Sequence, residues 1–138
     1  MTIFPNPYKS IDSKIRLIKC LNAKTRKEIC VIWNCACHPV LYHSPNNLTA
    51  HFPGEIRTHL RTKLNSDIPI IFLQGFAGDI RPFNTPQPQT IKEKLLYFLN
   101  KSADFKTFTK ESYSEWINHF TSVIDNLWNK PGKEFSSP

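Results

Sequence analysis

The sequence lacks any long apolar run and any apolar leader. No stretch approaches the roughly 18 consecutive apolar residues that a membrane-spanning helix requires, so we expect no transmembrane segment. The first residues, Met1 to Pro5, offer neither a basic n-region nor an apolar h-region, so we expect no signal peptide. As it stands, the chain is predicted to be cytoplasmic, and the location of any longer protein is left open.

Glycine and cysteine are also scarce, with four of each in 138 residues. There is no G-x-S-x-G elbow, no P-loop and no dinucleotide fingerprint, which argues against α/β serine hydrolases and nucleotide-binding folds. Four cysteines are too few and too localised for a disulfide scaffold. Cys35 and Cys37 would point to the same face of one strand, which is a poor geometry for a bridge. We expect reduced, mostly buried thiols.

The composition is that of one globular domain. Apolar residues make up 40% of the chain and charged residues 21%, and the length suits one core, so we expect a single domain over residues 1–138. Residues 1–13 are predicted to be an irregular lead-in and residues 129–138 a loose tail. The formal net charge is +7, but the basic residues are spread along the chain. This argues against a specific nucleic-acid site and favours a weak affinity for anionic surfaces.

Hydrophobic patterning predicts three strands. Residues 15–20 partly alternate between apolar and polar, as a half-buried strand does. Residues 29–37 form an almost continuous apolar run, which is typical of a strand covered on both faces. The polar link at 22–27 indicates that these two strands form a hairpin. Residues 68–73 make a third, short strand with Pro69 near its start, where a strand tolerates proline.

Three helices are predicted around these strands. Pro53 suits the first turn of a helix that ends near Leu64, and Thr90 begins a helix to about Leu99 with capping-box spacing. A last helix covers residues 111–128. The predicted fold is α/β, a small mixed sheet of about three strands with helices in the order β-β-α-β-α-α. The first helix should bury Phe52, Ile56, Leu60 and Leu64, and the last Trp116, Phe120, Val123 and Leu127, with Ile117, Ile124 and Trp128 beside them.

Polar residues follow two of the strands at the point where each strand ends. His38 follows the apolar run, and Gly78, Asp79 and Arg81 follow the third strand. Ligands of open α/β sheets bind beyond the carboxyl ends of the strands, so His38 and Asp79 should share one crevice if the strands are neighbours. A neutral imidazole is a good zinc ligand, and a nearby carboxylate can bind the metal, orient the histidine or act as a base.

Two plainer interpretations remain open at this stage. A histidine before proline is often a hydrogen-bonded structural residue, and an aspartate after glycine is ordinary turn chemistry. A self-contained structural zinc site is the other possibility, although the paired spacings of small zinc folds are missing. Its ligands would come from Cys35, Cys37, His38, His43 and His51.

The motifs together resemble a known family. Asn34 to Val40, then Phe52-Pro53-Gly54 opening a helix, then Ile71 to Pro82 look like the central part of the neutral/alkaline ceramidase family and its bacterial relatives. The resemblance covers about residues 5–83. It implies that the chain is part of a larger catalytic domain of a zinc-dependent amidohydrolase, which hydrolyses the N-acyl amide bond of ceramide-like lipids.

The resemblance also implies roles for individual residues. The histidine of the family's histidine–proline motif is a zinc ligand, which assigns His38 to the metal. Asp79 and Arg81 are the candidate catalytic residues, and Gly78 the candidate substrate-binding residue. Zinc would polarise the amide carbonyl and lower the pKa of a bound water.

Three departures from the family pattern limit what is expected of this chain alone. Arg81 stands where the family has a serine; it could bind an anionic group or a developing oxyanion but cannot be a nucleophile. His51 replaces an aspartate common before the Phe-Pro-Gly stretch. No match to the family's other zinc ligands appears, and a catalytic zinc needs about three from the protein. We therefore expect this chain alone to be inactive. The alternative is a non-catalytic basic module that binds anionic lipid or a protein partner.

Overall fold

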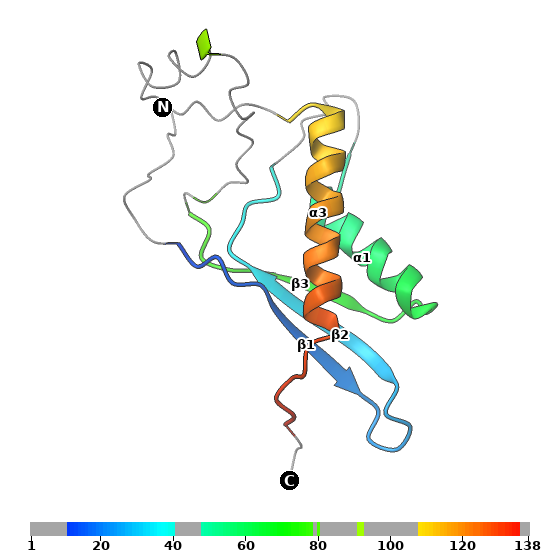
Figure 1. Cartoon of the computed structure of the whole chain (residues 1–138). Helices are drawn as coiled ribbons and strands as arrows, with labels where there is room; N and C mark the ends of the chain where they lie inside the picture. The colour runs from blue at the N-terminus through cyan, green and yellow to red at the C-terminus, as the bar shows by residue number, and fades with distance from the viewer. Residues whose placement is uncertain (1–10, 41–47, 79, 81–90, 93–107, 136–138) are drawn as a thin grey trace.

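The apolar segments assemble into one mixed sheet with helices packed against it (Figure 1). The computed structural model describes residues 11–40, 48–78, 80, 91–92 and 108–135. Strands lie in the order β1-β2-β3, with β1 and β2 antiparallel and β2 and β3 parallel. The predicted small α/β fold and its hairpin are confirmed. The strands are β1 (Arg16–Leu21), β2 (Glu28–Cys35) and β3 (Ile70–Gln74), and the helices are α1 (His51–Leu64) and α3 (Lys110–Trp128).

The hairpin turn between β1 and β2 is organised by one asparagine. The Asn22 side-chain oxygen accepts hydrogen bonds from the backbone N–H groups of Lys24 at 2.9 Å and Thr25 at 3.0 Å. The backbone N–H of Asn22 also donates to the Lys27 carbonyl at 2.8 Å. Asparagine favours such turns because its short side chain can bond to the backbone a few residues ahead. The turn thereby sets the register of the strand pair.

Helix α1 forms where the four-residue apolar period occurs. Phe52, Ile56 and Leu60 are fully buried, and Leu64 packs against the same core, as the spacing predicts. The helix ends at Asn65, which adopts the left-handed conformation with φ of 47°. Its N–H caps the carbonyls of Arg61 and Thr62, which would otherwise have no intrahelical partner.

Helix α3 begins with a reciprocal cap that the sequence analysis did not identify. The Thr109 hydroxyl accepts from the Ser112 backbone N–H at 3.2 Å, and the Ser112 hydroxyl accepts from the Thr109 N–H at 3.0 Å. Two N–H groups without helical partners are satisfied at once. On the buried side of the helix, Ile124 is fully enclosed, whereas Val123 and Leu127, expected in the buried stripe, are half-buried. The buried face is therefore rotated from the predicted one.

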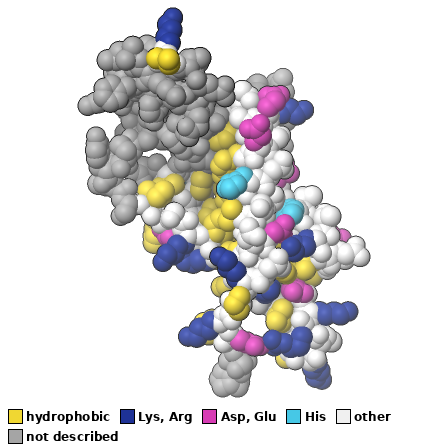
Figure 2. Space-filling model, in the orientation of Figure 1, with side chains coloured by type: hydrophobic (Ala, Val, Ile, Leu, Met, Phe, Trp, Pro, Cys, Tyr) yellow, Lys and Arg dark blue, Asp and Glu magenta, His cyan; other side chains and the backbone are white. Residues whose placement is uncertain are grey.

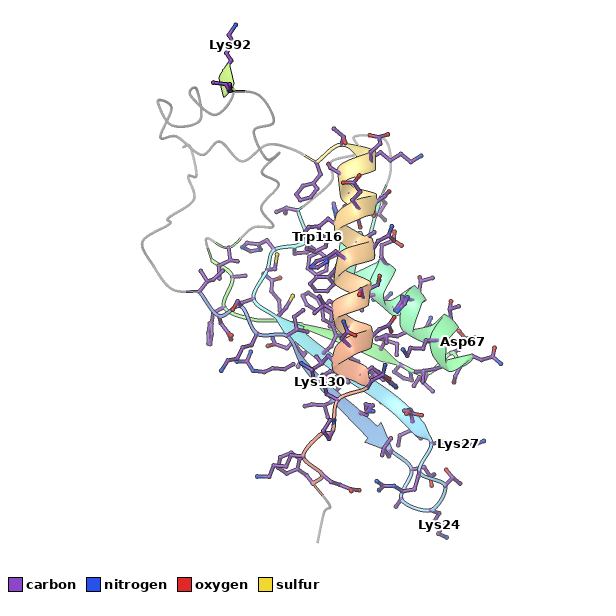
Figure 3. The ribbon with its side chains drawn as sticks, viewed as in Figure 1. Lys24, Lys27, Asp67, Lys92, Trp116 and Lys130 are labelled. Carbon is purple, nitrogen blue, oxygen red and sulfur yellow. The ribbon has the colours of Figure 1, made fainter. Side chains whose placement is uncertain are left out.

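The core lies between α1, α3 and one face of the sheet. Val31, Trp33 and Cys35 of β2 point into it, and the Trp33 ring lies 4.5 Å from that of Phe72 between centroids. Trp116 projects from α3 toward these rings and stacks on Phe120 at 4.9 Å (Figure 3). Such ring pairs contribute about 0.5–1.5 kcal/mol each beyond the area that they bury. Among the described residues, the largest fully buried side chains are those of Val31, Trp33, Phe52, Ile56, Leu60 and Ile124.

The opposite face of the sheet is open in the described part of the chain. Ile32 is the register partner of Ile18 on one side and of Ile71 on the other, so these three side chains share that face. Ile18 is 59% exposed, Ile71 41% and Leu73 51%. On β2 itself, Cys30, Ile32 and Asn34 are half-buried on this face, so the predicted cover of the second strand is only partial here. The helix predicted from Thr90 lies outside the described residues, apart from helical Ile91 and Lys92.

Candidate functional site

Parallel pairing brings the ends of β2 and β3 together. Cys35 is the register partner of Gln74, and the backbone N–H of Gly75 donates to the Cys35 carbonyl at 2.9 Å. One step further on, the N–H of His38 donates to the Ile80 carbonyl at 3.1 Å. The loop after β2 and the turn after β3 are thus joined by backbone hydrogen bonds. The expected meeting of the two strand ends at one edge is what the structure shows.

The imidazole of His38 is held by Gln74. Gln74 Nε2 lies 3.0 Å from His38 Nδ1. In this orientation the amide donates to Nδ1, so the proton of the neutral ring lies on Nε2. If the amide turns over, its oxygen accepts from Nδ1–H and leaves the Nε2 lone pair free for a metal ion, which is the usual arrangement of a metal-binding histidine. Gln74 therefore governs which ring nitrogen can act as a ligand.

Gly75 lies where the two strand ends approach each other closely. A Cβ atom at this position would lie 3.1 Å from the Ala36 Cα and 3.2 Å from its nitrogen. Both are backbone atoms, so they cannot rotate away as the end of a flexible side chain can. At Gly78, by contrast, a Cβ would meet nothing within 4 Å. The first glycine permits close packing of the strand ends, and the second lies exposed on the turn.

The other predicted site residues are only partly placed. Gly78 is described and exposed, and Ile80 is hydrogen-bonded to the loop of His38. Asp79 and Arg81, the predicted catalytic pair, lie outside the described residues, as does His43 of the alternative zinc set. The geometry thus joins His38 to the segment that carries Gly78.

A zinc ion would need ligands beyond those placed here. Among the described residues, no three His, Cys, Asp or Glu side chains lie close enough together to hold a metal. The imidazole of His38 suits zinc chemically, but one ligand falls short of the three that a catalytic site takes from the protein. The described residues do not by themselves make a zinc site.

The thiols of Cys35 and Cys37, which lie near His38 in the sequence, have low reactivity. Burial raises the pKa of Cys35 to about 11, and burial followed by the neighbouring Cys35 raises the pKa of Cys37 to about 12. The thiolate is the form that binds metals and attacks electrophiles, and at neutral pH it is scarce in both residues. Cys35 belongs to the core, and Cys37 is partly buried and packs against it just beyond the strand end.

A second polar cluster, which the sequence analysis missed, joins α1 to α3. The Asp125 carboxylate lies 2.7 Å from Lys63 Nζ and 3.0 Å from His59 Nε2. Partial burial acts to raise the pKa of Asp125, but the hydrogen bonds from Lys63 and His59 outweigh it and lower the pKa. His59 and Lys63 are four residues apart on one helical turn, which is the only sequence signal that could have suggested a shared partner. The cluster stabilises the helix pair.

The hairpin tip carries positive charge away from the core. Lys24 and Lys27 project from the turn, and basic side chains gather over that end of the molecule (Figures 2 and 3). Arg26 in the same turn pairs with Glu134 of the C-terminal segment, and both side chains are largely exposed. None of the described helices has the length and apolarity that crossing a bilayer requires.

Comparison of the chain with protein-family models, curated proteins and solved structures finds no match in any of the three. The resemblance to neutral ceramidases therefore rests on the motifs and stays a prediction.

Proposed function

We propose that this chain is part of the catalytic domain of a zinc-dependent amidohydrolase that acts on the N-acyl amide bond of ceramide-like lipids. The observation that supports the proposal most is the hydrogen-bonded junction of the His38 loop with the turn after β3. Open α/β sheets bind their ligands at the carboxyl ends of the strands. The proposed metal ligand and the glycine-flanked turn lie together at such an edge.

The proposal gives each residue a task. His38 is one zinc ligand, and Gln74 orients its ring. Gly78 lines the substrate path, Asp79 orients the metal site or accepts a proton, and Arg81 binds developing negative charge. Bound zinc would supply a polarised carbonyl and a more acidic water. The ligands that complete the site come from outside the described residues.

Metal analysis of the purified full chain tests this proposal. We expect the chain to bind zinc more weakly than a complete three-ligand site does, and His38→Ala to abolish this binding, because the substitution removes the ligand itself. His119→Ala, which removes an exposed histidine of α3, is the matched control and should bind zinc as the unchanged chain does. Gln74→Leu should weaken zinc binding by about 10- to 100-fold, because the ring loses its orienting partner.

Two results would overturn the assignment of His38 as a zinc ligand. Zinc retained in full by His38→Ala, or lost equally in His119→Ala, would show that this strand end does not hold the metal. A chain that folds and binds no zinc would contradict the proposal for this chain and favour a second candidate.

That second candidate is a non-catalytic module that binds an anionic membrane surface. It is favoured by the open sheet face, where Ile18, Ile71 and Leu73 are exposed, together with the basic hairpin tip. Exposed apolar side chains can enter the interface while lysines approach anionic headgroups, each contributing about 1 kcal/mol.

Vesicle binding separates the two candidates. Under the second, the chain should bind vesicles of phosphatidylserine and phosphatidylcholine, fail to bind phosphatidylcholine alone, and dissociate in high salt. Lys24→Glu with Lys27→Glu should abolish binding, whereas Arg57→Glu with Lys110→Glu, which changes the net charge equally, should have less effect. Equal loss in both double variants would show that net charge alone is responsible.

A further inference from the structure

Two cysteines face each other across the hairpin, away from the strand end that carries His38. Cys20 of β1 is the register partner of Cys30 of β2. Directly opposed residues of an antiparallel pair have Cα atoms about 4.5 or 5.5 Å apart, and both values lie within the Cα range of disulfides, about 4.4–6.8 Å. The pairing therefore places two thiols at bridging distance without any movement of the backbone.

The two thiols lie opposite each other in the strand register and are accessible. Both cysteines are free and partly exposed, and they lie on the open face, since they are in step with Ile18 and Ile32. Partial burial, and then the charge and hydrogen bond of the Cys20 thiol, raise the pKa of Cys30. The pair has both the proximity and the access that exchange chemistry needs.

The other two cysteines provide an internal comparison. Cys35 and Cys37 are only two positions apart in the sequence, but burial raises the pKa of Cys35 to about 11 and that of Cys37 to about 12. Strand β2 ends at Cys35, so Cys37 lies beyond the strand and no strand register sets it opposite Cys35. Sequence proximity thus points to the wrong pair, and the strand register points to Cys20 and Cys30.

We propose that Cys20 and Cys30 form a cross-strand dithiol site that reacts with a small disulfide oxidant, such as oxidised glutathione, and closes into an intramolecular disulfide. One cysteine thiolate attacks the oxidant, forms a mixed disulfide and releases one glutathione thiol. The second cysteine loses its proton and attacks the mixed disulfide, which releases the second glutathione thiol. Two protein thiols are oxidised and one glutathione disulfide is reduced to two thiols, so protons and electrons balance.

The bridge would join β1 to β2 beside the irregularity in register that follows Cys20. It would fix the pairing next to the turn at the basic tip. In a reducing compartment the dithiol form is favoured, and the disulfide forms when the oxidised share of glutathione rises. The site is independent of the zinc proposal, because neither cysteine contributes to the strand end that carries His38.

A glutathione titration of the full chain tests the proposal. The reduced chain is equilibrated without oxygen at increasing ratios of oxidised to reduced glutathione, quenched in acid, alkylated and weighed. We expect the folded chain to lose two alkylatable thiols and the mass of two hydrogen atoms. Half-oxidation should occur at a glutathione ratio at least about tenfold lower than for the chain in urea, because folding holds the thiols together.

Peptide mapping identifies the bridge. Trypsin releases Cys20 in the peptide 20–24, apart from the peptide that carries Cys30, Cys35 and Cys37. We expect the two peptides to be linked through Cys30, as fragment masses would show. Cys30→Ser should take one glutathione at Cys20 and form no internal bridge. Two stable glutathione adducts on the unchanged chain, a bridge to Cys35 or Cys37, or equal oxidation of folded and unfolded chains would each overturn the proposal.

Discussion

The two faces of the sheet are built from the same strands but differ in burial. On the covered face, Val31 and Trp33 are fully buried against α1 and α3. On the open face, their strand neighbour Ile32 lies between Ile18 and Ile71, which are 59% and 41% exposed. Apolar residues occupy both faces, so hydrophobicity alone does not decide which face is buried. What decides it is where the helical stripes of α1 and α3 pack.

The largest expected effect comes from the covered face. Trp33→Ala should lower the free energy of unfolding by about 3–5 kcal/mol, because it removes a fully buried ring and leaves a cavity. Urea unfolding followed by far-UV circular dichroism measures this, with Ile71→Ala as the control from the open face. An equal loss of unfolding free energy in the two variants would show that the two faces are equally buried.

The next effect is at the junction of the strand ends. Gly75→Ala should lower the free energy of unfolding by about 1–3 kcal/mol, because the new Cβ would lie 3.1 Å from the backbone of Ala36. Gly78→Ala makes the same chemical change on the same turn with no neighbour within 4 Å, so its cost should be close to zero. Thermal unfolding of the two variants gives the difference. A harmless Gly75→Ala would mean that the two strand ends lie further apart.

The third effect concerns the ion pairs of Asp125 between α1 and α3. Asp125→Asn should lower the free energy of unfolding by about 1 kcal/mol at neutral pH, which is the usual contribution of partly exposed ion pairs. The pKa of Asp125 is lowered from its ordinary value of 3.8, so the stabilisation is present above that value and is lost as the pH falls through the lower, folded-state pKa. Urea unfolding of the unchanged and variant chains should therefore converge as the pH is lowered below about 4. A difference that persists in acid would show that charge is not the cause.

The smallest effect is expected on the open face. Leu73→Ser should change the free energy of unfolding by less than about 0.5 kcal/mol, because half of this side chain is already exposed. The same urea titration measures it. A loss comparable to that of a core residue would show that another segment or a second copy of the chain covers this face in solution.

Much of the fold follows from local patterns in the sequence. The four-residue period of Phe52, Ile56 and Leu60 defines the buried stripe of α1, and Asn22 lies where the hairpin turn needs it. The run in β2 was harder to interpret, because a strand apolar at every position carries no information on which face is covered. In α3, several apolar faces compete, and tertiary packing selected the one around Ile124.

The candidate site could be predicted only in part. The proximity of His38 to the turn after β3 followed from parallel pairing, which a helix between two apolar strands suggests. The role of Gln74 could not be predicted, because it depends on a one-to-one register with Cys35 that no local signal sets. The same reason hid the pairing of Cys20 with Cys30, which are ten positions apart in the sequence but adjacent in the sheet.

Strand β3 also forms one margin of the sheet, and within the described ranges no strand is hydrogen-bonded to its outer side. Its five residues, Ile70 to Gln74, carry no charge, and Pro69 interrupts the run only at its start. Such a margin is a template for stacking of identical copies into fibrils. The net charge of +7 opposes that association by mutual repulsion, and added salt weakens this opposition because it screens the charges.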